Sequence, residues 1–225
     1  MKNNIFIWGS KSKALIINKV IANYKKELNL SLSNIKSNLK IKYIFDPYNT
    51  KPNFKSNAVF SNKINDLKKF LKNSNHFIVC IGSNFGKARY YISRELEKLK
   101  CKPLSVINKY SFLDSTSTLG KGIIVMPNVT LHCYSKVGDY CILNTSATIE
   151  HECIIGHGTH IMGGACVAGR VKIGKRCFIA PNSVIDVGCE IGEDCLIGTS
   201  SLVRYSFPKN SVIIGSPAKR IRKNI

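Results

Sequence analysis

The sequence predicts a small α/β domain followed by a parallel β-helix, and the second part rests on a period of six residues. From residue 113 to residue 203, every sixth residue is Leu, Ile or Val. These residues are Leu113, Leu119, Val125, Leu131, Val137, Leu143, Ile149, Ile155, Ile161, Val167, Ile173, Ile179, Ile185, Ile191, Ile197 and Val203. Four residues after each of them the side chain is nearly always small, and five of these small residues are cysteines. One large aliphatic and one small residue in every six is typical of the coils of a parallel β-helix.

A longer period of 18 residues sets the shape of the β-helix. Gly120, Gly138, Gly156, Gly174 and Gly192 each directly follow one of the aliphatic residues. Because 18 residues make three hexads, one coil has three short faces, and the region forms a triangular prism of about five coils. We expect these glycines to mark one corner that recurs in each coil, since glycine accepts a positive φ angle without steric cost.

Residues 1–110 alternate short apolar runs with segments of helical periodicity. The apolar runs predict strands at residues 4–8, 41–45, 58–60, 77–81 and 104–107, and the periodicity predicts helices at residues 13–30, 65–71 and 85–99. Such alternation is typical of a parallel sheet with helices on both faces, a Rossmann-like domain. We place the domain boundary at residue 110, so that residues 111–225 form the β-helix and a C-terminal tail. In this tail, residues 211–214 are a predicted strand and residues 215–220 a turn.

One rim of the predicted sheet carries candidate ligand-binding residues. Gly9, Ser10 and Lys11 follow the first strand, Asp46 follows the second, and Gly82 follows the run at residues 77–81. Ligands of parallel sheets bind beyond the carboxyl ends of the strands. The sequence therefore predicts that these residues share one ligand-binding edge.

Composition narrows the classes of function. The chain has 225 residues, 44% of them hydrophobic, and no run of 18 apolar residues, so we expect no membrane insertion. The apolar stretch near the first residue is too short for a signal peptide, and we expect a cytoplasmic protein. Nine cysteines without a CxxC pair indicate free thiols in a reducing compartment rather than a metal site or a disulfide framework.

The positive charge is concentrated in the first half of the chain. Of the net charge of +21, residues 1–110 contribute +17, from 22 Lys and Arg against 5 Asp and Glu, and the remainder contributes +4, from 12 against 8. A basic domain can meet phosphates, an anionic membrane or nucleic acid. The lysines are scattered among Asn and Ser without interleaved aromatic residues, which favours a solvated surface, and we expect no nucleic-acid partner.

His151 is the candidate catalytic residue of the β-helix. It lies two residues after Ile149, and the same position holds Cys133 one coil earlier and Gly169 one coil later. The glycine leaves open space beside the imidazole, which suits a general base next to a slim, extended ligand. Glu152 can hold the tautomer of the imidazole and raise its basicity. The alternative is a set of exposed polar residues without a catalytic role.

A zinc site is a competing interpretation of the histidines. His151 and His157 are six residues apart and therefore lie on neighbouring faces of the prism. Within one chain they cannot converge on a single ion, whereas a site shared between subunits stays open. We expect no metal.

Several segments resemble the sugar-nucleotide acetyltransferases of the PglD/NeuD type. These segments are residues 142–153, His160, residues 168–174 and residues 214–220. The resemblance extends over the whole chain in layout. It implies that the β-helix is left-handed, an exception to the right-handed crossover rule. It also implies a homotrimer with acetyl-CoA, a co-substrate, in the groove between adjacent β-helices.

The resemblance further implies roles for individual residues. His151 would be the general base that takes a proton from the sugar amine, with Glu152 as its partner, and His160 would lie near the acetyl carbonyl. The remaining implied contacts are Gly169, Pro181 and Gly198 along the pantetheine, Gly215 and Lys219 near the adenine, Asn144 near the sugar, and Gly9, Ser10, Lys11, Asp46 and Gly82 at the nucleotide.

The first loop departs from the pattern of this family. Relatives often carry Gly-x-x-Gly-His-Gly, whereas residues 9–13 read Gly-Ser-Lys-Ser-Lys. Side-chain donors and a charge from Ser10, Ser12 and Lys11 could replace the backbone donors, or the specificity for base and sugar has changed. Residues 81–84 with Arg89 still resemble the second rim segment of the family.

We therefore expect an acetyl-CoA-dependent N-acetyltransferase that acts on the amino group of a nucleotide-linked (UDP, dTDP or GDP) amino-dideoxy sugar by direct attack on the thioester. Products of this kind feed the synthesis of surface polysaccharides and glycans. The alternatives are a sugar O-acetyltransferase of the sialic-acid type, a catalytically inactive trimeric scaffold, and a zinc hydratase.

Overall fold

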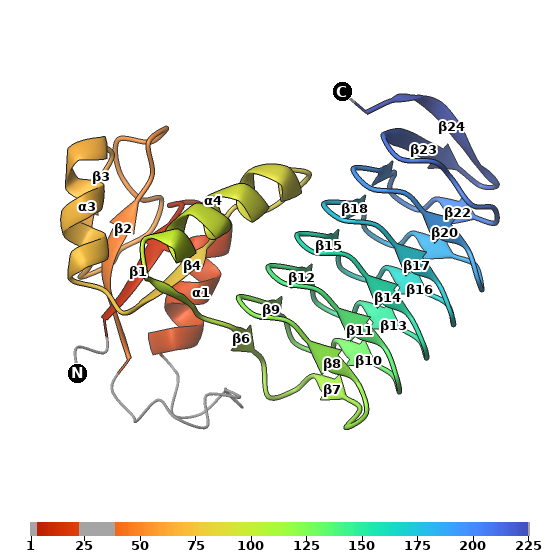
Figure 1. The fold of residues 1–225 in the computed structure, drawn as a ribbon, viewed down its shortest axis with the longest axis horizontal. Helices are drawn as coiled ribbons and strands as arrows, with labels where there is room; N and C mark the ends of the chain where they lie inside the picture. Colours follow the sequence, from red (N-terminus) through yellow and green to blue (C-terminus); the bar gives the residue numbers. More distant parts are fainter. Residues whose placement is uncertain (1–3, 23–38, 225) are drawn as a thin grey trace.

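The computed structural model describes residues 4–22 and 39–224, which form an α/β domain and a triangular prism of stacked coils (Figure 1). The sheet of the α/β domain is parallel, with the strand order β3-β2-β1-β4-β5. Its elements are β1 (Asn4–Trp8), α1 (Ser12–Ala22), β2 (Lys40–Phe45), β3 (Val59–Ser61), α3 (Ile64–Lys72), β4 (His76–Val79), α4 (Gly86–Lys98) and β5 (Lys102–Pro103). The predicted helix at residues 13–30 is confirmed as far as residue 22, and its remainder lies outside the described residues.

Helices cover both faces of this sheet, as predicted. Ile5 and Ile7 of β1 pack with Ile17 of α1, and the same apolar cluster continues into the β-helix. Phe6, between them in sequence, points to the opposite face, where Phe70 of α3 and Leu96 of α4 contribute to a second cluster. The prism contributes to both clusters, with Ile142 in the first and Tyr140 in the second.

Three sheets form the faces of the prism, and their strands are parallel except for the terminal pair of β23 and β24. The docked sheet, on which the α/β domain packs, contains β6 (Val106–Ile107), β9 (Ile124–Val125), β12 (Ile142–Leu143), β15 (His160–Ile161), β18 (Phe178–Ile179), β21 (Leu196–Ile197), β23 (Ser211–Gly215) and β24 (Ala218–Lys223). The uncharged sheet contains β7 (Phe112–Leu113), β10 (Thr130–Leu131), β13 (Thr148–Ile149), β16 (Cys166–Val167), β19 (Val184–Ile185) and β22 (Leu202–Val203). The charged sheet contains β8 (Thr118–Leu119), β11 (Lys136–Val137), β14 (Ile154–Ile155), β17 (Lys172–Ile173) and β20 (Glu190–Ile191).

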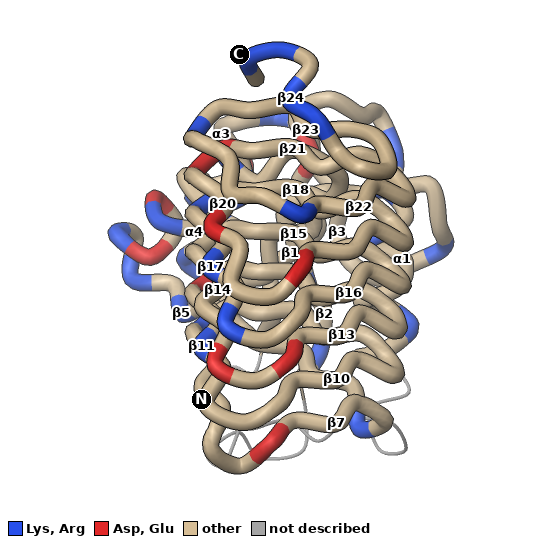
Figure 2. Tube along the Cα trace, turned by 90° about the vertical axis from the view of Figure 1, so that its right-hand side faces the viewer, with Lys and Arg blue, Asp and Glu red and all other residues tan. Residues whose placement is uncertain are grey.

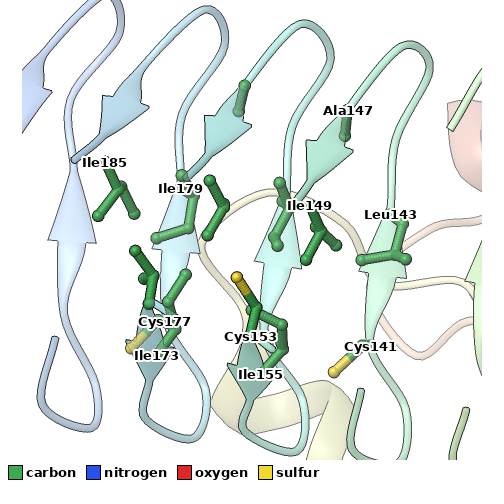
Figure 3. Packing of buried hydrophobic residues seen from close by; sticks show 14 of the residues in the cluster. Cys141, Leu143, Ala147, Ile149, Cys153, Ile155, Ile173, Cys177, Ile179 and Ile185 are labelled. Atoms are coloured by element: carbon green, nitrogen blue, oxygen red, sulfur yellow. The ribbon is translucent and has the colours of Figure 1, made fainter. Parts of the chain in front are cut away.

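The period of six residues is confirmed as the core of the prism. Each aliphatic residue of that period is the second residue of a strand from β7 to β22 and belongs to, or packs against, a single apolar cluster. Figure 3 shows Leu143, Ile149, Ile155, Ile173 and Ile179 pointing into the interior. The period therefore predicts both the strand positions and the inward side chains.

The small inward residues bind the carbonyl groups of the next coil. The Cys141 Sγ donates to the Gly156 carbonyl at 3.2 Å, the Cys153 Sγ donates to the Ala168 carbonyl at 3.1 Å, and the Ser135 hydroxyl donates to the Glu150 carbonyl at 2.6 Å. A buried carbonyl without a partner is costly. Cys, Ser and Thr thus suit this position because they are small and also carry a hydrogen-bond donor.

The glycines of the 18-residue period do not adopt a positive φ, and our explanation of them was wrong. The left-handed conformation instead recurs every six residues from Gly122 to Ser200, mostly at residues other than glycine, such as Tyr140 and Glu152. A Cβ added at Gly156 would lie 2.5 Å from the backbone of Gly174 and Lys175, which stack on it. These glycines are required by the close approach of successive coils.

The connection between the two domains also differs from the prediction. The strand expected at residues 104–107 is observed only as β6, and it pairs with β9 in the docked sheet, whereas the last strand of the α/β sheet is β5, which precedes this range and pairs with β4. The change of sheet follows Pro103, the last residue of β5. Of the residues between β5 and β6, only Leu104 is buried. The domain boundary at residue 110 stays a prediction.

At the other end of the prism, the predicted strand at residues 211–214 is confirmed as β23. The predicted turn is shorter than expected, because Lys219 and Arg220 already belong to β24, which pairs antiparallel with β23. Ala218 is buried in the core cluster and closes the end of the prism.

The outward faces of the prism differ in charge. The first residue of each strand points outward, and in the uncharged sheet these residues are Phe112, Thr130, Thr148, Cys166, Val184 and Leu202. In the charged sheet, Lys136, Lys172 and Glu190 take this position, whereas the tube in Figure 2 is tan at the labelled strands β10, β13 and β16 of the uncharged sheet. Among the described helices, none has the length and apolar character needed to cross a membrane.

Candidate functional site

His151 and Glu152 form a hydrogen-bonded pair at the corner between β13 and β14. Ile149 ends β13, and Glu152 has a φ of 59°, which turns the chain from the uncharged sheet to the charged sheet. The Glu152 amide donates to the Cys133 carbonyl of the previous coil, and the His151 carbonyl accepts from the Arg170 amide of the next, both at 2.9 Å. The stacked coils therefore hold the backbone of this pair on both sides.

The side chains of this pair are arranged as a base and its orienting group. His151 Nδ1 lies 3.0 Å from Glu152 Oε2, and the two side chains are 42% and 53% exposed. A carboxylate only accepts hydrogen bonds, so Nδ1 carries the proton and Nε2 presents a lone pair. The geometry can accept a proton from a nucleophile that reaches Nε2.

Gly169 provides the space for the imidazole itself. A Cβ added at Gly169 would lie 2.5 Å from His151 Nε2 and 2.7 Å from its Cε1. We expected open space between the glycine and the ring, and the structure shows that the ring fills it. Gly169 therefore determines the position of Nε2.

Three other predicted residues lie at the opposite edge of the uncharged sheet. Asn144 follows β12, Pro181 follows β18 and Gly198 follows β21, so all three lie at the corner where the docked sheet turns into the uncharged sheet. His151 and Gly169 lie where the uncharged sheet ends and the charged sheet begins. Within one chain, the predicted site residues thus form two groups, separated by the width of one face.

Gly215 and Lys219 extend the group that contains Gly198. The Gly215 amide donates to the Ser201 hydroxyl at 3.2 Å, and Lys219 pairs with Ile214 across the terminal hairpin. A Cβ at Gly198 would lie 2.8 Å from Ile214 Cγ1. The C-terminal hairpin therefore packs directly on this corner.

His160 does not reach either corner. It belongs to β15 of the docked sheet, its exposed fraction is 1%, and its ring packs edge-on against Phe178 with the centroids 5.7 Å apart. Nδ1 lies 3.1 Å from the Ser83 carbonyl, and Nε2 is buried with no partner in the described part of the chain. Burial lowers the pKa of His160 to about 3, so the ring is neutral.

The predicted rim residues do come together, although Asp46 binds the chain itself. Its carboxylate accepts from the Ser10 amide at 2.9 Å, the Ser10 hydroxyl at 2.7 Å, the Tyr48 amide at 3.0 Å and the Asn49 side chain at 2.8 Å. A carboxylate has about four lone-pair sites. Asp46 thus fixes the loop of Gly9 and Ser10, and Lys11 beside it is exposed.

Lys13 is a half-buried cation and Arg89 a buried one; neither is among the predicted site residues, although Arg89 belongs to the segment that resembles the second rim segment of the family. A Cβ added at Gly82 would have only one neighbouring atom, Lys13 Cε, at 4.0 Å. Burial lowers the pKa of Lys13 and lowers that of Arg89 to about 10. The only signal for Lys13 in the sequence is its place at the end of the first loop.

The remaining histidines give no metal site. His157 lies between β14 and β15, at a different corner from His151, and its Nδ1 accepts the Asp139 amide at 2.8 Å. Within residues 4–22 and 39–224, no three His, Cys, Asp or Glu side chains are grouped as metal ligands would be.

Comparisons with known proteins agree with this architecture. The bacterial transferase hexapeptide family (six repeats) matches residues 152–186. PerB from Caulobacter crescentus, solved in complex with CoA and GDP-perosamine, has 22% identity and a TM-score of 0.80, with 96% of each chain covered. The acetyltransferase domain of PglB from Neisseria gonorrhoeae, solved with acetyl coenzyme A, has 17% identity and a TM-score of 0.79, with 98% of this chain and 100% of that domain covered. WeeI from Acinetobacter baumannii has 19% identity and a TM-score of 0.78, with 96% of this chain and 99% of that protein covered.

The chain shares the fold of these proteins. That fold is an α/β domain followed by a left-handed parallel β-helix, as the sequence predicts. The matched hexapeptide segment begins at Glu152 and contains Gly169 and Pro181. Both edges of the uncharged sheet are therefore represented in the matched segment.

Proposed function

We propose that this protein is an acetyl-CoA-dependent N-acetyltransferase that acts on the amino group of a nucleotide-linked amino-dideoxy sugar. The observation that carries the proposal is the pair of His151 and Glu152, with Nε2 free to accept a proton at a corner of the left-handed β-helix. The fold is shared over nearly the full length with PerB, which binds CoA and GDP-perosamine. Nine free cysteines support a reducing, cytoplasmic setting.

In the proposed reaction, the sugar amine attacks the thioester carbonyl of acetyl-CoA. His151 Nε2 accepts a proton from the amine as the C–N bond forms, and Glu152 stabilises the resulting imidazolium. The C–S bond then breaks, and the proton passes to the departing CoA sulfur. The products are the acetamido sugar nucleotide and free CoA.

Direct attack is favoured over a covalent acetyl-enzyme. Cys166 is the cysteine among the outward residues of the uncharged sheet, and burial raises its pKa, so it stays a protonated and weak nucleophile. The prism core holds most of the other thiols, where substrate has no access.

We further propose that the active protein is a trimer in which each site is shared by two chains. The two groups of predicted residues lie at opposite edges of the uncharged sheet, so one chain alone cannot bring them together. If two chains meet through this sheet, His151 and Gly169 of one chain face Asn144, Pro181 and Gly198 of the next. Acetyl-CoA would lie along the latter corner and end near Gly215 and Lys219. The outward strand residues of this sheet carry no charge, and charged side chains directly follow its strands only at the edge toward the charged sheet, which supports such contact.

The rim of the α/β domain is the proposed docking place of the nucleotide. Ser10, Lys11 and Gly82 line this rim, and Lys13 adds a half-buried cation that suits a phosphate group. Asp46 acts indirectly here, because its hydrogen bonds fix Ser10. We leave His160 out of the cofactor contacts, since its side chain is buried in the docked sheet.

An acceptor panel tests the proposal. The purified full chain is incubated with acetyl-CoA and with UDP-, dTDP- or GDP-linked amino sugars, the same sugars without nucleotide, and hydroxyl acceptors such as sialic acid. We expect CoA release and a gain of one acetyl group only with a nucleotide-linked amino sugar. Acetylation of a free hydroxyl sugar would instead establish an O-acetyltransferase, and the absence of CoA binding by calorimetry would establish a scaffold.

A further inference from the structure

From the contacts between the two domains, we infer that His160 and Arg89 are positioning residues that fix residues 81–83 of the α/β domain on the β-helix and so set the place of the acceptor substrate relative to His151. The structural part of this inference stands on the contacts alone. Its consequence for the acceptor rests on the proposed function.

Residues 81–83 are held at both ends by side chains that connect to the prism. Arg89 Nη1 donates to the Ile81 carbonyl at 2.8 Å, and His160 Nδ1 lies 3.1 Å from the Ser83 carbonyl. Ser83 has a φ of 50°, an unfavourable conformation for a residue other than glycine. A segment with such a backbone keeps its shape only where its surroundings impose it.

Arg89 joins this segment to two coils of the β-helix. Its Nε donates to the Tyr140 carbonyl at 3.0 Å, and its Nη2 donates to the Gly158 carbonyl at 2.6 Å. The guanidinium is buried, and all three of its acceptors are neutral carbonyl groups. The N-terminus of α4 is equally close to the prism, because a Cβ added at Gly86 would lie 2.6 Å from the Gly158 carbonyl. These contacts leave the segment little freedom to shift along the docked sheet.

The orientation of the His160 ring decides which substrate it serves. A carbonyl oxygen is only an acceptor, so the contact with Ser83 requires the proton to be on Nδ1. Nε2 of the neutral ring then carries a lone pair and cannot donate a hydrogen bond to the carbonyl of an acetyl group. Nε2 is also buried, with no hydrogen-bond partner in the described part of the chain. His160 therefore acts through Ser83 on the α/β domain, rather than on acetyl-CoA as the resemblance implies.

The consequence concerns Gly82, which lies between the two anchored carbonyls. Gly82 is the rim residue predicted to contact the nucleotide-linked substrate, and Lys13 Cε lies beside it. Loss of either anchor lets this part of the rim move relative to its own prism, and so relative to the His151 that the neighbouring chain supplies in the proposed trimer. Binding of the acceptor is then weakened, whereas the acetyl-CoA contacts proposed for the prism corners are unchanged.

Three substitutions at His160 separate the two roles. The amide nitrogen of His160→Asn takes the place of Nδ1, that of His160→Gln takes the place of Nε2, and His160→Leu has no donor. We expect His160→Asn to retain the acceptor KM within about threefold, and the other two to raise it about tenfold, the value of one hydrogen bond. The Kd for CoA, measured by calorimetry, is expected to be unchanged in all three.

Hydrogen–deuterium exchange of the peptide that covers residues 80–86 provides a readout that does not need activity. We expect faster exchange of this peptide in His160→Leu and His160→Gln and near-normal exchange in His160→Asn. Unchanged exchange in His160→Leu, a weakened affinity for CoA, or rescue by Gln rather than Asn would each overturn the inference. If the wild-type protein transfers no acetyl group, the proposed function fails, while the exchange experiment still decides whether His160 holds the segment.

Discussion

At the scale of single residues, the position of the candidate base His151 depends on the absence of a Cβ atom at Gly169. The imidazole of His151 packs against the backbone of Gly169, and Glu152 fixes the ring from the other side at 3.0 Å. The backbone of Gly169 does not need a positive φ, since it is absent from the glycines with that conformation. The lack of a side chain at residue 169 thus serves the geometry of the site rather than the fold.

Gly169→Ala is therefore expected to impair catalysis with little effect on stability. The new Cβ would lie 2.5 Å from Nε2, so the ring must move away from the proton that it accepts. A misplaced catalytic group can cost about a hundredfold in kcat, which steady-state kinetics will measure. Val187→Ala, at the same corner one coil further along, is the matched control and should retain normal turnover. Equal activity of the two variants would show that the ring position is unimportant.

His160 gives the protein a dependence on pH that is independent of catalysis. The folded state keeps the ring neutral with a pKa of about 3, whereas the unfolded chain takes up a proton near pH 6.5. The stabilisation is therefore complete above pH 6.5 and is lost as the pH falls toward 3. The pKa of His76 is lowered by burial in the same direction.

We expect the free energy of unfolding of the wild-type protein to decrease by roughly 2 to 3 kcal/mol more than that of His160→Asn between pH 7 and pH 4.5. Denaturant titrations of both proteins at the two pH values will measure this difference. Parallel pH dependences of the two proteins would mean that His160 is protonated in the folded state.

At the scale of elements, stacking of coils explains a pattern that conformational preference does not. Gly120, Gly138, Gly156, Gly174 and Gly192 stack on one another, and each would bring an added Cβ within 3 Å of the next coil. The residues with positive φ lie elsewhere and recur every six residues. The 18-residue period therefore reports the separation of neighbouring backbones.

Two glycine substitutions distinguish crowding from backbone strain. Gly156→Ala is expected to lower the free energy of unfolding by roughly 3 kcal/mol, because backbone atoms of Gly174 cannot move away. Gly188→Ala, at a φ of 70° but with no atom within 4 Å, should cost about 1 kcal/mol. Denaturant unfolding measures both values. A larger loss of stability for Gly188→Ala than for Gly156→Ala would mean that a positive φ, and not crowding between coils, is the main reason for glycine in the prism.

The elements also show how far the sequence determines the fold and the site. The period of six predicts every strand from β7 to β22, because each coil repeats the same inward side chains. Taken one step further back, the same period reaches Ile107, which lies in the prism core in β6, although we predicted a strand of the α/β domain at residues 104–107. By contrast, the contacts of Arg89 and His160 join residues 51 to 77 positions apart in sequence, and no local pattern records them. The pair of His151 and Glu152 is local, and it was predicted from adjacent residues.

At the scale of the whole molecule, one face of the prism determines whether the site can be complete. The docked sheet packs against the α/β domain through β6, β9 and β12, and the charged sheet carries lysines and a glutamate. The strand residues of the uncharged sheet carry no charge, and Phe112 and Val184 among them are exposed. The two groups of candidate residues lie at its two edges. Assembly through this face therefore links oligomeric state to activity.

Thr148→Arg places a charge in the middle of the uncharged sheet and should disrupt assembly and acetyl transfer together. Thr118→Arg makes the same change on the charged sheet and is expected to be neutral in both respects. Analytical ultracentrifugation gives the oligomeric state, and the CoA-release assay gives the activity. A trimeric and active Thr148→Arg variant would place the subunit contact on another face.

The most direct test of the central claim is the effect of His151→Ala on acetyl transfer to a nucleotide-linked amino sugar. Removal of a general base typically lowers kcat by about 10² to 10⁴. We predict a loss in this range, with the Kd for CoA unchanged, because His151 takes the proton of the attacking amine. A variant that keeps kcat within about tenfold of the wild type would contradict the assignment of His151 as the base.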